Sequence, residues 1–203
     1  MRMNHAEKAR KLTTMSLLLA IMAILTFTPL GFIQITPIVA VTLMHIPVLI
    51  GLLCEGFLSG LALGFLFGTL SLVRAFTSTA GLLTPFFMNP AVSVLPRMLV
   101  PCVSWLAYKG MALIIKGKAR LPAAWISSAI AGTITNTVAV LGSIYLLYAA
   151  PLAENPAVAS AGVMPFLGGI VLTNCLPEAA LAALVVPALM GALTRMRGRS
   201  AVI

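Results

Sequence analysis

Charged side chains occupy short stretches of this chain, and long apolar runs separate them. Of the 203 residues, 61% are hydrophobic and 8% are charged, and the mean hydropathy is +1.10. Soluble domains are about one quarter charged, so this composition excludes a water-soluble fold. Because lipid offers the backbone no hydrogen-bond partners, apolar runs of this length fold as helices. The sequence therefore predicts an all-α integral membrane protein in which residues 1–203 form one membrane domain.

Six apolar runs approach or exceed the length of about 20 helical residues that crosses a bilayer. The predicted spans are Leu12–Leu30, Pro37–Cys54, Phe57–Val73, Ala91–Ile115, Leu121–Ala149 and Pro165–Leu193. The second and third are short and closely joined, so one bent re-entrant hairpin is the alternative to the two separate spans that we favour. The first follows a basic start, as a secretory signal does, but it is too long for a signal peptide and is predicted to be retained.

The basic residues fix the predicted orientation of the six spans. All but Arg74 and Arg97 fall at the amino terminus, at the end of the fourth span and the link to the fifth, or in the tail. They are Arg2, Lys8, Arg10, Lys11, Lys109, Lys116, Lys118, Arg120, Arg195, Arg197 and Arg199. Because cytoplasmic segments carry the excess of lysine and arginine, both termini are predicted to be cytoplasmic. The two exceptions then lie toward the outer face.

The three predicted outer connections carry a single charge, Glu154. They are Gly31–Thr36, Phe76–Pro90 and Ala150–Met164. The second contains the apolar sequence GLLTPFFM, which would be unfavourable in water. We therefore expect it to fold back over the helices as a cap on a pocket near the outer face.

Several classes of function find no support in the motifs. The net charge of +9 is explained by orientation, and no basic face interleaved with aromatic residues predicts nucleic-acid binding. Cys54, Cys102 and Cys175 lie in apolar runs at no metal-ligand spacing, so they are interpreted as small hydrophobic residues. The sequence has no phosphate-binding lysine loop, zinc-protease motif or nucleophile elbow. We therefore predict neither an enzyme nor a metal or cofactor site.

The fourth span places Asn89, Ser93 and Arg97 at four-residue spacing, hence on one helical face. An arginine at the centre of a spanning helix costs roughly 2.5–3.5 kcal/mol, so Arg97 and Arg74 are expected to have a partner. An amide, a hydroxyl and a guanidinium together suit a polar ligand with a carboxylate, which arginine binds bidentately. The alternative is that both arginines reach lipid phosphates at the membrane surface.

The sixth span places Asn174 and Glu178 on one face, with Pro177 between them. Pro177 frees the carbonyl of Thr173, which can open the helix around a site. At 1.5 Å per residue, Glu178 lies roughly 20 Å into the span, where a carboxylate must be protonated, paired or hydrated. An ion pair with Arg97 is the alternative to a role in ligand binding.

Further polar residues and a glycine series complete the candidates. Gly56, Gly60, Gly64 and Gly68 share one face of the third span, which favours close helix packing inside the bundle over a sliding surface for a partner. The lesser polar candidates are His45, Asn136, Gln34 and Thr36. A lone histidine on an apolar helix is more often a hydrogen-bonded interior residue than a ligand contact.

Taken with the six predicted spans, the runs VTLMHIPVLIG, FGTLSLVRAF and MNPAVSVLPR resemble the substrate-binding S components of energy-coupling-factor (ECF) vitamin transporters, and within these the pantothenate type. The resemblance extends over nearly the whole chain and rests mainly on residues 41–97. It implies high-affinity binding of a vitamin from outside, in a pocket near the outer face of a bacterial-type cell membrane. The pocket residues that it implies are Gln34, Thr79, Asn89, Arg97, Asn174 and Glu178, to which the residue pattern adds Ser93.

The resemblance also implies partners. They are a transmembrane coupling subunit and two cytoplasmic ATPases, with which the S component reorients in the bilayer to release the vitamin. The coupling subunit would contact an Ala-x-x-x-Ala pattern on the first helix, which here reads Ser16-x-x-x-Ala20 followed by Ala23. The alternatives are a proton-coupled transporter that uses Glu178, an S component for pyridoxine or a thiamine precursor, and a membrane scaffold without a ligand.

Overall fold

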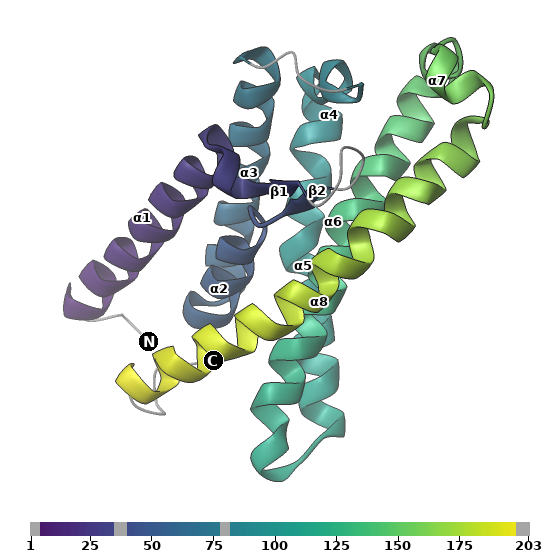
Figure 1. Cartoon of the computed structure of the whole chain (residues 1–203). Coiled ribbons are helices and arrows are strands. Elements are labelled where there is room, and N and C mark those ends of the chain that lie inside the picture. Colours follow the sequence, from purple (N-terminus) through teal and green to yellow (C-terminus); the bar gives the residue numbers. More distant parts are fainter. Residues whose placement is uncertain (1–4, 35–39, 78–81, 198–203) are drawn as a thin grey trace.

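The computed structural model describes residues 5–34, 40–77 and 82–197, which form a bundle of helices with one short β-hairpin (Figure 1). The α-helices are α1 His5–Phe27, α2 Ile46–Glu55, α3 Phe57–Thr77, α4 Pro90–Ser93, α5 Leu95–Ile114, α6 Arg120–Ala153, α7 Pro156–Ala159 and α8 Val163–Arg197. Short 3-10 turns are η1 Pro29–Gly31, η2 Thr84–Met88 and η3 Gly117–Ala119. The strands are β1 Phe32–Gln34 and β2 Ala40–Thr42.

Among the described residues, five helical segments are long and apolar enough to cross a membrane. They are His5–Phe27, Phe57–Thr77, Pro90–Ile114, Gly117–Ala153 and Val163–Met196. The prediction of a multi-span helical membrane protein is therefore confirmed, and five of the six predicted spans coincide with these segments.

The prediction of a second spanning helix over Pro37–Cys54 was wrong. The α2 helix has ten residues, from Ile46 to Glu55, and at about 1.5 Å per residue it is too short to cross a bilayer alone. The chain before it forms an antiparallel β-hairpin, in which Phe32 pairs with Thr42 and Gln34 with Ala40. Hydrophobicity alone does not separate a buried strand from a buried helix, and this stretch begins with Pro37 and is rich in β-branched residues.

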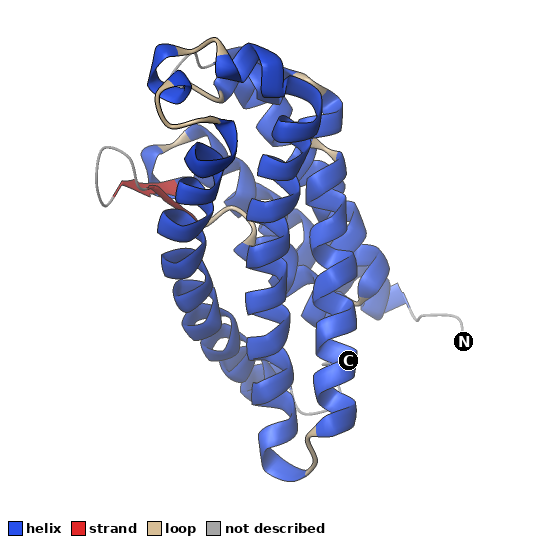
Figure 2. Cartoon of the chain, turned by 90° about the vertical axis from the view of Figure 1, so that its right-hand side faces the viewer, coloured by secondary structure: helices blue, strands red, loops and turns tan. Residues whose placement is uncertain are grey.

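The hairpin lies at the margin of the bundle, in its upper half in this view (Figure 2). Strand β2 packs against α8, so two segments far apart in the sequence meet there. The α2 and α3 helices are separate elements that meet at Gly56, whose φ of 90° ends α2. The favoured prediction of two separate spans is therefore met only by α3, because α2 is half a span.

Prolines shape the predicted fourth span, as the sequence indicates. It is broken at Val94 into α4 and α5, and Pro96 lies in the first turn of α5, where its missing N–H costs nothing. The side-chain oxygen of Asn89 accepts a hydrogen bond from the N–H of Ala91 at 2.9 Å and caps α4.

The predicted close packing of α3 is confirmed at its glycines. A methyl group on Gly64 would lie 2.7 Å from the carbonyl oxygen of Arg97, and one on Gly68 would lie 2.6 Å from the Cα of Val94. Both neighbours are backbone atoms of the α4–α5 segment. The absence of side chains at these positions therefore sets how closely α3 and α5 approach.

Two clusters of buried apolar residues stabilise the bundle. The larger joins α1, α2, α3, α5, α6 and the second half of α8, with Leu49, Leu63 and Met190 at its centre. The smaller joins α4, the second half of α6, α7 and the start of α8, around Ile144 and Leu152. The start of α1 and the end of α8 lie at the same end of the bundle, opposite α4 and α7 (Figure 1).

Candidate functional site

A cavity of about 400 Å³ lies among α3, α5, α6, α8, the η2 segment and β2. Its volume falls in the range of about 300–1,000 Å³ that is typical of small-molecule sites. Its lining residues come from the second half of α3, the first turn of α5 and the first half of α8, so it lies nearer the end of the bundle that is opposite the termini. The polar lining residues are Thr42, Ser71, Arg74, Thr84, Arg97, Asn136, Thr137, Asn174 and Glu178.

Arg97 forms the cationic wall of the cavity and is only 6% exposed. Its Nη1 donates a hydrogen bond to the carbonyl oxygen of Val92 at 2.8 Å, and its Nη2 donates to Ser71 Oγ at 3.4 Å. The guanidinium carbon lies 5.5 Å from the ring centre of Phe67 and 5.0 Å from that of Phe87. Contact with two aromatic rings stabilises a cation that has left water.

The hydrogen bonds that Arg97 makes within the described residues do not use all its donors. Its buried Nε has no hydrogen-bond partner there, and each Nη carries two hydrogens. Arg74, on α3, lines the same side of the cavity and donates from Nη1 to the carbonyl oxygen of Thr26 at 2.7 Å. The two guanidinium groups make this wall strongly positive.

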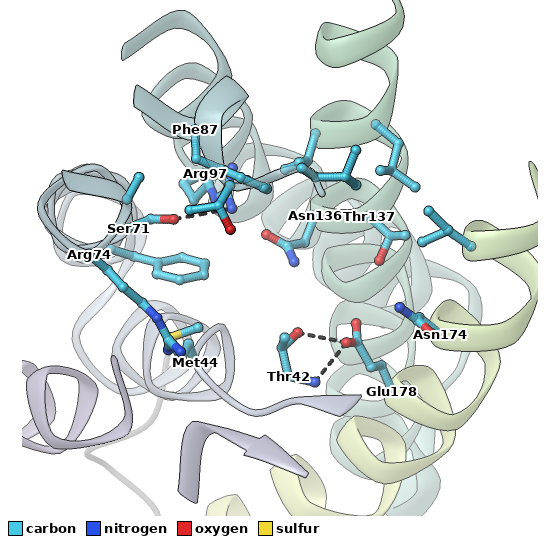
Figure 3. Close-up of a pocket in the computed structure, with 17 residues that line it drawn as sticks. Thr42, Met44, Ser71, Arg74, Phe87, Arg97, Asn136, Thr137, Asn174 and Glu178 are labelled. Carbon is cyan, nitrogen blue, oxygen red and sulfur yellow. Dashed lines mark hydrogen bonds between the residues drawn. The ribbon is translucent and has the colours of Figure 1, made fainter. Parts of the chain in front are cut away.

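Glu178 forms the opposite, acidic side of the cavity and is 4% exposed (Figure 3). Its Oε1 accepts hydrogen bonds from the backbone N–H of Thr42 at 2.7 Å and from Thr42 Oγ1 at 2.6 Å. Both of these donors belong to Thr42, the last residue of β2, and no ion pair joins Glu178 to Arg97 within the part of the chain that the structure describes. Glu178 holds the hairpin against α8.

Amide and hydroxyl groups lie beside Glu178 on this side of the cavity. Asn136 and Thr137 come from α6, and Asn174 lies one turn before Glu178 on α8 (Figure 3). Asn136 is 8% exposed, and its Oδ1 is buried without a hydrogen-bond partner among the described residues. Unsatisfied buried acceptors are costly, so this oxygen can accept a hydrogen bond from a ligand or water. The cavity thus has a cationic wall facing a wall of neutral donors, acceptors and one carboxylate.

Asn89 and Ser93 do not line the cavity with Arg97, contrary to the predicted shared face. Besides capping α4, Asn89 donates from Nδ2 to the hydroxyl of Tyr148 at 2.9 Å, and Ser93 Oγ donates to the carbonyl oxygen of Phe87. Asn89 has extended backbone angles and precedes the first turn of α4, so it lies outside the regular helix on which the prediction of a shared face rested. Both residues position the segment that carries Phe87.

The other predicted positions fall in three groups. His45 is buried, and because Thr133 Oγ1 donates to the carbonyl of Ala129, it accepts from His45 Nε2–H at 2.9 Å. His45 is therefore an interior residue that joins α2 to α6 outside the cavity, in line with the interpretation that the sequence favoured. Gln34 lies in β1, while Thr36 and Thr79 fall outside the described residues.

On α1, Ser16 and Ala20 are exposed and Ala23 is half-buried. These three side chains are accessible on the outside of the bundle, as a docking face requires.

Sequence reasoning missed several lining residues. Thr42 falls in the stretch predicted as helix, and Ser71 and Thr137 are common polar residues in apolar runs with no distinctive spacing. Phe67 and Phe87, which contact Arg97, read as ordinary apolar positions. For part of the missed lining, the sequence did give a signal. The apolar stretch before the fourth span was expected to fold over the pocket, and Leu83, Thr84 and Phe87 from this stretch line the cavity.

The chain matches the family described as "ECF transporter, substrate-specific component" over residues 10–190, a range that contains every lining residue of the cavity. It is also 32% identical over 210 residues to the pantothenic acid transporter PanT of Lactococcus lactis subsp. cremoris (strain MG1363). That alignment covers 96% of this chain and 98% of the relative. The resemblance predicted from the sequence is confirmed, and the chain belongs to the family of substrate-specific components of ECF transporters.

Proposed function

We propose that this protein is the membrane-embedded vitamin-binding subunit of an ATP-driven ECF importer, and that its vitamin is pantothenate. The observation that carries the proposal is the cavity itself, in which Arg97 and Arg74 face Glu178, Asn174 and Asn136. The name of the relative, a pantothenic acid transporter, favours the same ligand.

Pantothenate complements the two walls of the cavity. It carries a carboxylate at one end, hydroxyl groups at the other and an amide between them. Its carboxylate would bind the remaining donors of Arg97, with Arg74 adding positive potential, because charge-assisted hydrogen bonds to arginine are strong and directional. Its hydroxyls would donate to Glu178 and to the unpartnered Asn136 Oδ1. Two cations and one carboxylate in the lining leave one positive charge, which a monoanion neutralises.

Uptake would require partners, because nothing in the sequence predicts a nucleotide site. We propose that a transmembrane coupling subunit docks on the α1 face around Ser16, Ala20 and Ala23, and that two cytoplasmic ATPases supply the energy. Reorientation of the S component in the bacterial cell membrane would then move the cavity from the outer side to the cytoplasmic side. Gln34 and Thr79 stay predictions as additional ligand contacts.

The test is equilibrium calorimetry of the purified protein with pantothenate. Arg97→Ala is expected to weaken binding at least tenfold, which corresponds to about 1.4 kcal/mol, because it removes the carboxylate donors. Arg120→Ala is the matched control, since Arg120 is exposed at the start of α6 and far from the cavity. Equal affinity of the Arg97→Ala protein and the wild type would remove the proposed role of this residue.

Two further outcomes separate the competing functions. Liposomes that contain this chain alone should show no uptake driven by a pH gradient, because the proposal assigns energy coupling to partner subunits. Proton-driven uptake that Glu178→Gln abolishes would instead favour a secondary transporter. A panel of pyridoxine, thiamine precursors and pantothenate in a thermal-shift assay would identify a different vitamin if the ligand assignment is mistaken, and no shift with any of them would indicate a scaffold.

A further inference from the structure

A second cavity lies on the outside of the bundle, between α1 and the start of α3. It has a volume of about 460 Å³ and is lined by Lys8, Lys11, Leu12, Met15, Leu58, Ser59 and Ala62. The two lysines stand at one end of this groove, and the other lining residues are apolar apart from Ser59. We propose that the groove is a binding site for an anionic phospholipid, with an acyl chain along the apolar part and the phosphate at the lysines.

The groove follows from the register of α1. Lys8, Lys11, Leu12 and Met15 recur at three- and four-residue intervals, so they share one helical face. The face changes from basic to apolar along the helix axis, as the membrane changes from headgroup to hydrocarbon. Leu12 is 68% exposed and Leu58 is 76% exposed, so the groove opens to the surroundings of the bundle rather than to its interior.

The charge at the head of the groove favours an anion. Lys8 is exposed, and Lys11 donates a long hydrogen bond from Nζ to the carbonyl oxygen of Glu55 at 3.4 Å. The charge near the head of the groove is positive on balance. Three basic residues, Lys8, Arg10 and Lys11, outnumber the two carboxylates of Glu7 and Glu55. The first turn of α3 adds the positive end of a helix dipole beside Leu58 and Ser59.

Position in the bilayer favours a lipid over other anions. The lysines belong to the amino-terminal segment that is predicted to be cytoplasmic, at the level where phospholipid phosphates lie. Basic pockets between membrane helices on this side bind anionic headgroups. A free phosphate would use the lysines but leave the apolar length of the groove without a ligand. The groove therefore matches both parts of one phospholipid molecule.

The experiment is native mass spectrometry of the full chain in detergent with an equimolar mixture of phosphatidylglycerol and phosphatidylcholine that carry the same acyl chains. Phosphatidylglycerol should bind in preference, and the double variant Lys8→Ala/Lys11→Ala should weaken its binding about 30-fold, on the basis of roughly 1 kcal/mol per lysine. The control is Lys116→Ala/Lys118→Ala, which removes the same charge from the exposed η3 region without touching the groove, and should leave binding unchanged.

A second pair of variants tests the apolar part of the groove. Ala62→Phe should fill it and displace the lipid, whereas Ala180→Phe, at an exposed position on α8, should have no effect. Equal binding of the two lipids, or equal loss in the two lysine variants, would overturn the proposal. Unchanged lipid binding by the Lys8→Ala/Lys11→Ala protein together with loss of its assembly with a coupling subunit would assign the groove to a protein partner instead. Pantothenate binding should be unaffected by all four variants, which separates this inference from the proposed function.

Discussion

Arg97 shows how a guanidinium can be kept in an apolar bundle without an acidic partner among the described residues. A buried charge is tolerated when its hydrogens are bonded and its surroundings are polarisable. Here a main-chain carbonyl, a serine hydroxyl and the faces of Phe67 and Phe87 supply those contacts. Because none of these partners carries a negative charge, Arg97 retains its positive potential. That potential remains available to an anionic ligand.

Glu178 has the complementary role in the proposed ligand specificity. Its carboxylate would accept a ligand hydroxyl but repel a phosphate at the same position, because like charges in a site of low dielectric are strongly unfavourable. Glu178→Gln keeps an oxygen that can accept from Thr42 while it removes the charge. We expect this change to raise the affinity for pantothenate phosphorylated on its terminal hydroxyl, relative to pantothenate, at least tenfold.

Competition binding with the two ligands measures this ratio. Asn174→Ala, which leaves the charge of Glu178 in place on the same helix, is the control and should not favour the phosphorylated compound. An unchanged ratio in the Glu178→Gln protein would show that the hydroxyl end of the ligand lies elsewhere.

At the scale of elements, α3 depends on the absence of side chains where it crosses the α4–α5 segment. The backbone atoms of Arg97 and Val94 occupy the space that methyl groups on Gly64 and Gly68 would need. The same close approach brings Ser71, one turn beyond Gly68 on α3, to Arg97. Packing of α3 and the geometry of the cationic wall are therefore coupled.

Gly64→Ala should accordingly destabilise the protein and weaken ligand binding together. Its new methyl group would meet the carbonyl oxygen of Arg97 at 2.7 Å and Pro101 Cγ at 3.2 Å, neither of which can rotate away. Overpacking of this kind costs about 1–3 kcal/mol, and a chain of this size loses roughly 3 °C in Tm per kcal/mol. Thermal unfolding in detergent measures the effect. Gly191→Ala on α8, with nothing within 4 Å of the new methyl group, should leave Tm unchanged or slightly raised.

At the scale of the whole molecule, the polar cavity lies between two apolar clusters. The larger cluster lies toward the termini, and the smaller one fixes α4, α7 and the second half of α6 at the opposite end. The cavity borders both clusters, since Met44 and Phe67 from the larger and Leu141 from the smaller are among its lining residues.

The orientation of the bundle can be tested by cysteine labelling in whole cells. In a background without Cys54, Cys102 and Cys175, a membrane-impermeant thiol reagent should label Ala161→Cys, at the link between α7 and α8. It should not label Lys118→Cys in η3 until the membrane is permeabilised, because the basic end is predicted to be cytoplasmic. Labelling of Lys118→Cys in intact cells would reverse the orientation.

The sequence predicted the helices better than it predicted the site. Long apolar runs form helices in lipid, because a helix satisfies its own backbone hydrogen bonds. Hydrophobicity alone therefore placed α1, α3, α6 and α8. The segment from Phe32 to Glu55 could not be placed in this way, because the same apolar composition is compatible with a spanning helix and with a hairpin followed by a short helix. Arg97, Asn174 and Glu178 were found because charged and amide groups are rare in such runs. Thr42 and Ser71 were missed because single hydroxyls are common there.

What the sequence determined by itself was the class of protein, its helical membrane domain and the rare residues that must have partners. These follow from solvation, since the cost of a charge or an open backbone in lipid does not depend on the fold. Only the tertiary structure decided which partners they have. Asn89 caps α4 and Ser93 bonds to the carbonyl of Phe87, so both make structural contacts, and the hairpin brought Thr42 to Glu178 across 136 positions. Such pairings depend on where elements distant in sequence meet, and hydrophobicity does not encode that.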